Sequence, residues 1–138
     1  MDITALLQLC LDQEASDLHL STGLPPLLRV HGEMHRVETM PPLTQDGVLA
    51  MLHAVMAAPD AQRLAQTLEC DFACDLAGLG RFRVNAFHTQ RGAAAVFRAI
   101  PSQVRTLAQL GAPPLFAELA LRPRGLVLVT GPTGCGKS

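Results

Sequence analysis

The stretch that most restricts the fold is RGLVLVTGPTGCGKS, at residues 124–138. An uninterrupted apolar run, Leu126 to Val129, leads directly into a glycine-rich turn. Such a run is typical of a strand buried on both faces of a parallel sheet. A strand followed at once by this glycine pattern predicts the first strand and phosphate-binding loop of an α/β domain.

The turn matches the pattern G-x-x-x-x-G-K-[ST]. In such a loop the glycines leave backbone N–H groups pointing at phosphate oxygens, the lysine reaches the β and γ phosphates, and the last hydroxyl binds Mg²⁺. We therefore expect Lys137 to act on the phosphates and Ser138 to bind the metal. The alternative is a glycine-rich turn with a coincidental Lys-Ser end. The expected nucleotide-binding residues are Gly131, Pro132, Thr133, Gly134, Cys135, Gly136, Lys137 and Ser138.

The choice of basic residues supports this interpretation. Lys137 is the single lysine beside ten arginines. A slim ammonium fits among phosphate oxygens as a point charge, where a planar guanidinium is too wide.

Two further expectations concern the loop. A thiol at Cys135, beside a helix start and Lys137, has a lowered pKa, so its oxidation or alkylation would block the site when nucleotide is absent. The alternative is that Cys135 is only a small, tolerated residue.

Because a phosphate loop works with the helix and carboxylates that follow it, we expect this chain to be the front part of a larger protein, with weak nucleotide binding and no hydrolysis alone.

The first half of the chain predicts helices and strands in turn. Residues 16–21 alternate as a half-buried strand does, with Leu18 and Leu20 on the buried side. LLRVHGEMHRV predicts a hairpin that turns at Gly32-Glu33. Helices are expected over residues 3–15 after a capping Asp2, from a cap at Thr44, and from Pro59.

From Cys70 onward the pattern predicts three consecutive strands, over residues 70–77, 81–88 and 93–100, as an antiparallel meander. Helices followed by such a sheet indicate a compact α+β domain over residues 1–100. The proline-bearing residues 101–112 are expected to be a linker, and residues 113–138 to begin the α/β domain with a short helix at LFAELAL.

The hairpin GRFRVNAFHTQRGAAAVFRAIP sets two arginines against each other. With a loop of two or four residues around Gln90-Arg91, Arg83 lies directly opposite Arg98 on the less apolar face. Like charges in this position are destabilising by up to about 1 kcal/mol, so the pair predicts an anion nearby, and a phosphate would serve. The alternative is that the two side chains reach solvent or pair with acidic residues of the neighbouring strand: Glu69, Asp71 or Asp75.

Composition excludes several function classes. The formal net charge of −1 gives no reason to expect nucleic acid as a partner. No apolar run is long enough to span a membrane, and the acid-bearing N-terminus is unlike a signal peptide, so a cytoplasmic protein is expected. The four cysteines lack metal-binding spacing, and Cys70 and Cys74 are expected on the core side of a strand.

Three segments, ASDLHLSTGLPPLLRVHGE, GRFRVNAFHTQRGAAAVFRAIP and RGLVLVTGPTGCGKS, together resemble the twitching-motility ATPases that retract type IV pili, within the secretion-ATPase superfamily. The resemblance covers residues 1–138. It implies a PAS-like N-terminal domain, then the first helix, strand and phosphate loop of a RecA-like ATPase domain, with ATP and Mg²⁺ bound between the domains. It also implies that Arg83 and Arg98 approach the nucleotide phosphates as catalytic residues. Cys135 departs from the serine more usual in the family.

The resemblance further implies a homohexameric ring in the cytoplasm, at most peripheral to the membrane, that acts on an inner-membrane pilus platform protein. Two alternatives stay open. The chain could belong to a pilus-assembly or type II secretion ATPase of the same superfamily. If Ser138 is the true C-terminus, it could instead be a noncatalytic oligomerisation or sensor module. The coding sequence past Ser138 would distinguish them.

Overall fold

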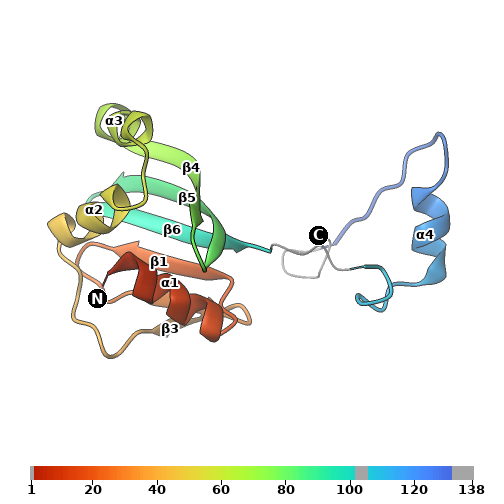
Figure 1. Cartoon of the computed structure of the whole chain (residues 1–138), viewed down its shortest axis with the longest axis horizontal. Coiled ribbons are helices and arrows are strands. Elements are labelled where there is room, and N and C mark those ends of the chain that lie inside the picture. Colours follow the sequence, from red (N-terminus) through yellow and green to blue (C-terminus); the bar gives the residue numbers. More distant parts are fainter. Residues whose placement is uncertain (1, 102–105, 132–138) are drawn as a thin grey trace. The chain divides into compact units, whose positions relative to one another are not determined.

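The structure is a computed structural model that describes residues 2–101 and 106–131 (Figure 1). The chain divides into two compact units, Met1–Ser102 and Gln103–Ser138. The first unit is an α+β domain, in agreement with the fold class expected from the sequence.

A six-stranded antiparallel sheet forms the centre of the first unit, with strand order β3-β2-β1-β6-β5-β4. Figure 1 shows how β1 lies beside β6 and so joins the N-terminal strands to the later meander. The strands are β1 (Asp17–Ser21), β2 (Leu27–Val30), β3 (Glu33–Arg36), β4 (Glu69–Leu76), β5 (Gly80–Thr89) and β6 (Gly92–Ile100).

Three helices complete this unit: α1 (Ile3–Asp12), α2 (Gln45–His53) and α3 (Ala58–Thr67). The predicted caps are confirmed, since the Asp2 carboxylate accepts from the Ala5 N–H at 2.9 Å and the Thr44 hydroxyl accepts from the Gly47 N–H at 3.1 Å. Helix α1 ends earlier than predicted, because Glu14 adopts a left-handed φ of 50° that a continuing helix does not allow.

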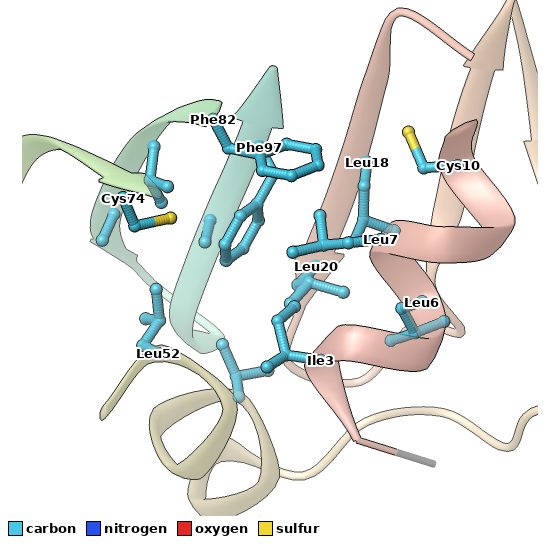
Figure 2. Close-up of a cluster of buried hydrophobic side chains, with 14 of the residues drawn as sticks. Ile3, Leu6, Leu7, Cys10, Leu18, Leu20, Leu52, Cys74, Phe82 and Phe97 are labelled. Carbon is cyan, nitrogen blue, oxygen red and sulfur yellow. The ribbon is translucent and has the colours of Figure 1, made fainter. Parts of the chain in front are cut away.

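The core lies on one face of the sheet. Helix α1 directs Leu6 and Leu7 toward Leu18 and Leu20 of β1 and toward Phe82 and Phe97 of the meander (Figure 2). Cys70 and Cys74 are buried, which confirms their expected place on the core side of β4, and Cys10 of α1 is buried as well. The largest fully buried side chains are Phe82, Phe97, Leu6, Leu7, Leu18, Leu20, Leu28 and Leu52.

Of the two hairpins, β5–β6 has the predicted register and β2–β3 differs from the predicted one by one residue. In the β5–β6 hairpin Arg83 pairs with Arg98 and Thr89 with Gly92, so the predicted register is confirmed. The β2–β3 turn was predicted one residue too late. Val30 pairs with Glu33, and the loop is His31-Gly32, whose φ angles of 49° and 89° match a type I′ turn.

In the second unit, the expected short helix is α4 (Pro114–Ala120). The strand expected at residues 126–129 is not formed, and its side chains are exposed, with Leu126 at 82%. An apolar run becomes a strand only when a neighbouring strand takes its backbone hydrogen bonds, and the described residues of this unit supply none. Across residues 2–101 and 106–131, no helix is both long and apolar enough to cross a membrane.

Candidate functional site

The sheet face opposite the core carries a row of charged side chains. Strand alternation places Asp17, Arg29, Arg83 and Arg98 on this face, and the pairing makes them neighbours across four strands. Asp17 pairs with Arg29 on β2 and with Arg98 on β6, and Arg98 pairs with Arg83 on β5. We call these four residues the arginine row.

Asp17 is the buried member of the row, with 3% of its surface exposed. Its Oδ1 accepts from Arg98 Nε at 2.8 Å, and its Oδ2 accepts from the Ser16 hydroxyl at 2.9 Å and lies 3.5 Å from Arg29 Nε. Burial alone would raise the pKa of Asp17, but the hydrogen bonds from Arg98 and Ser16 and the charge of Arg98 hold it below its ordinary value. Asp17 is therefore an anion at neutral pH.

Arg83 and Arg98 differ in how they are held. Arg98 makes a short bond to the buried Asp17, whereas Arg83 Nη2 lies 3.4 Å from Asp71 Oδ2, with both of those side chains more than half exposed. The repulsion expected between the two arginines is thus offset within the chain by two carboxylates. The alternative of acidic partners on the neighbouring strand is confirmed for Asp71, while Asp17 comes from a strand that was not considered.

The two arginines border a shallow depression of about 310 Å³ on the open face. It is lined by Asp71, Arg83, Asn85, Val96 and Arg98. This volume is at the lower end of the range for small-ligand sites, about 300–1,000 Å³. The guanidinium groups make the depression suited to oxyanions such as phosphate.

Asp17 and Arg29 are site residues that sequence reasoning missed. The alternation of residues 16–21 placed Asp17 on the polar side of its strand, but it did not indicate which strand lies alongside. The neighbour is β6, whose Arg98 follows Asp17 by 81 positions.

His19, two residues after Asp17, is a minor member of the same face. Burial lowers the pKa of His19, and its Nε2 has no hydrogen-bond partner among the described residues. This ring is therefore neutral at physiological pH.

The phosphate loop lies almost wholly outside the described residues. Gly131 is described and belongs to no helix or strand, and residues 132–138, with Lys137 and Ser138, lie outside. Within residues 2–101 and 106–131, no cluster of three or more His, Cys, Asp or Glu could hold a metal.

The chain combines an α+β domain that carries arginines on its open sheet face with a phosphate-loop sequence. Comparison with known proteins shows the family to which it belongs. Residues 1–138 match the family described as Type II/IV secretion system protein, and the chain belongs to that family. It is 51% identical to the Type IV pilus retractation ATPase PilT of Pseudomonas aeruginosa, over 100% of this chain and 40% of that protein.

Two further relatives agree. A twitching motility protein of Neisseria gonorrhoeae is 50% identical over 82% of this chain and 30% of its own length. A crystal structure of the pilus retraction motor PilT with bound ADP gives a TM-score of 0.81 at 35% identity, covering 99% of this chain and 40% of that one. The chain thus spans no more than 40% of the length of these relatives.

Proposed function

We propose that this chain is the N-terminal part of a hexameric motor ATPase that hydrolyses ATP to retract type IV pili and drive twitching motility. The observation that carries the proposal is the 51% identity to PilT across the entire chain. The activity is proposed for the whole protein, and the present residues alone are expected to be inactive.

The domain organisation is proposed as follows. Residues 1–100 form a PAS-like domain, residues 101–112 a linker, and residues 113–138 the beginning of a RecA-like ATPase domain. The division of the chain into units that meet at Ser102 and Gln103 supports a boundary in this region. The exposed apolar side chains at residues 126–129 are consistent with a strand that is covered once the rest of such a sheet is present.

ATP and Mg²⁺ are the proposed ligands. Residues 131–138 would hold the nucleotide, with Lys137 on the β and γ phosphates and Ser138 on Mg²⁺. Arg83 and Arg98 would approach the phosphates from the sheet of the N-terminal domain. Two observations support this role for the arginines. They border a depression that suits oxyanions, and the similar crystal structure contains ADP. Mg²⁺ would neutralise charge on the transferred phosphoryl group.

The proposed assembly is a homohexamer in the cytoplasm that works on an inner-membrane pilus platform protein without binding nucleic acid. The pilus function in the names of the relatives and the low net charge of this chain support these assignments.

The decisive test uses the whole protein, expressed from its complete reading frame. We expect magnesium-dependent ATP hydrolysis that Lys137→Ala abolishes, while Lys137→Ala leaves the hexamer intact by light scattering. A folded whole protein with no affinity for adenine nucleotides in the presence of magnesium would refute the proposal.

A further inference from the structure

We propose that Asp17 is the positioning residue for Arg98. It holds the guanidinium through Nε and leaves the Nη1–Nη2 edge for two phosphate oxygens. This inference rests on the proposed function, since it assumes that Arg98 meets a nucleotide.

The atoms in contact carry the first step. Arg98 Nε donates to Asp17 Oδ1 at 2.8 Å, within the range of charge-assisted hydrogen bonds. The one side-chain hydrogen bond of Arg98 to the described residues is made by Nε, and its Nη groups donate none. The Arg98 side chain is 66% exposed, so these groups are accessible to a ligand. Because a guanidinium is planar, a bond through Nε fixes the direction of the Nη1–Nη2 edge, which is one of the two edges that can bind an oxyanion in bidentate fashion.

The carboxylate itself is well held. Asp17 lies on β1 between β2 and β6, which restrains its backbone on both sides. Its second oxygen is occupied by Ser16 at 2.9 Å and by Arg29 at 3.5 Å. A buried anion with its two oxygens engaged by separate partners has little freedom to rotate, so it can orient the group attached to it.

Arg83 provides a contrast within the same depression. Its contact to Asp71 runs through Nη2, the kind of atom that a phosphate would need, at 3.4 Å between exposed side chains. Such a pair is weak and readily exchanged. A phosphate would therefore displace Asp71 from Arg83, whereas it would add to Arg98 without displacing Asp17.

The chemical benefit is preorganisation. An unrestrained arginine samples many rotamers, and holding it in one orientation before the nucleotide arrives removes an entropic cost from the reaction. We expect this orientation to raise the rate of hydrolysis, because the Nη1–Nη2 edge of Arg98 faces the charge that develops on the phosphoryl group.

The test is a double-mutant cycle on ATP hydrolysis by the whole protein, with Asp17→Asn, Arg98→Ala and the two combined. Asp17→Asn keeps the side-chain shape and removes its charge. We expect it to lower kcat about tenfold or more, and we expect the double variant to be no slower than Arg98→Ala, because Asp17 acts through Arg98. Asp75→Asn is the matched control, since Asp75 lies 3.9 Å from Arg81 in an exposed pair on the same sheet and should leave kcat unchanged.

The outcomes separate the inference from the proposed function. Wild-type kcat in Asp17→Asn, or losses that multiply in the double variant, would overturn the positioning role while leaving the ATPase proposal intact. Wild-type kcat in Arg98→Ala would refute the role of Arg98 itself, and the positioning role with it.

A second variant keeps the test valid if Asp17→Asn fails to fold. Arg98→Lys retains a cation that can pair with Asp17 but has no Nη fork, so we expect it to be as slow as Arg98→Ala. Wild-type kcat in a folded Arg98→Lys protein would overturn the inference, because charge alone would then suffice.

Discussion

Arg83 and Arg98 lie directly opposite each other on β5 and β6, and each is neutralised from the other side by a carboxylate, Asp71 for Arg83 and Asp17 for Arg98. The strength of the two contacts differs, because Asp17 is buried and Asp71 is exposed. The row thus combines one restrained and one loosely held guanidinium beside a single depression.

The first prediction concerns this pair in the whole protein. Arg83→Ala and Arg98→Ala should each lower ATP hydrolysis sharply, by about a hundredfold, the scale seen when one charge-stabilising donor is removed from a transition state. The hexamer should persist in Arg83→Ala, since the exposed pair of Arg83 with Asp71 contributes little to the fold. Arg98→Ala removes the nearest partner of the buried Asp17 and should also lower the free energy of unfolding, so its turnover is measured on protein shown to be folded and hexameric. Phosphate release and light scattering measure the two properties. Arg91→Ala, in the exposed hairpin turn, is the control, and wild-type turnover in either test variant would exclude a role for that arginine.

The second prediction is a pH dependence of stability. The pKa of Asp17 is lower in the folded chain than its ordinary value of about 3.9, so the folded state binds the proton less well than the unfolded state. The stability that Asp17 contributes is therefore complete above about pH 4 and is lost as pH falls through its folded pKa. Asp17→Asn should reduce the free energy of unfolding at neutral pH, and the difference from wild type should shrink in strong acid.

Urea unfolding followed by far-ultraviolet circular dichroism, at about pH 7 and about pH 3, measures this difference. Glu38→Gln is the control, because the Glu38 side chain is exposed in a turn outside the helices and strands and has no ion-pair partner among the described residues. A destabilisation by Asp17→Asn that is equal at the two pH values would show that its carboxylate charge is not the cause.

The third prediction concerns the end of α3. Leu68 caps this helix in the left-handed conformation, with φ of 63°, and its side chain is 55% exposed. Leucine is strained in this conformation and glycine is not, so Leu68→Gly should stabilise the chain by about 0.5–1 kcal/mol in urea unfolding. The control is Gln66→Gly, within α3, which should destabilise by about 1 kcal/mol. Equal losses in the two variants would contradict the predicted strain.

How much of this structure the sequence predicts depends on how far apart in the sequence the contacting residues lie. The Arg83–Arg98 register was predictable because a two-residue loop and strict alternation determine which residues of one hairpin face each other. The pairing of β1 with β6 was not, because alternation indicates the face of a strand and not its neighbour. Asp17 therefore went unrecognised as the partner of Arg98, although its strand had been predicted.

Two errors have local physical reasons. His31 adopts the left-handed conformation and is the first residue of the turn, and Gly32 is the second. The sequence predicts Gly32 as the first. The apolar run at residues 126–129 has the composition of a buried strand, but composition does not supply the neighbouring strands that would accept its hydrogen bonds. The β2–β3 turn therefore lies one residue earlier than predicted. The strand predicted at residues 126–129 has no partner strand among the described residues.

The fourth prediction concerns the thiols. Burial raises the pKa of Cys10 to about 11, and burial also raises the pKa values of Cys70 and Cys74, so none of the three forms a reactive thiolate at neutral pH. In the native whole protein these three should resist alkylation, as read by intact mass and peptide mapping, and all should react in denaturant. Any native labelling at Cys135 should be tested with and without ATP, since protection by ATP would support its place in the nucleotide site. Rapid native labelling of Cys10, which is fully buried, would contradict the packing of α1 against the sheet.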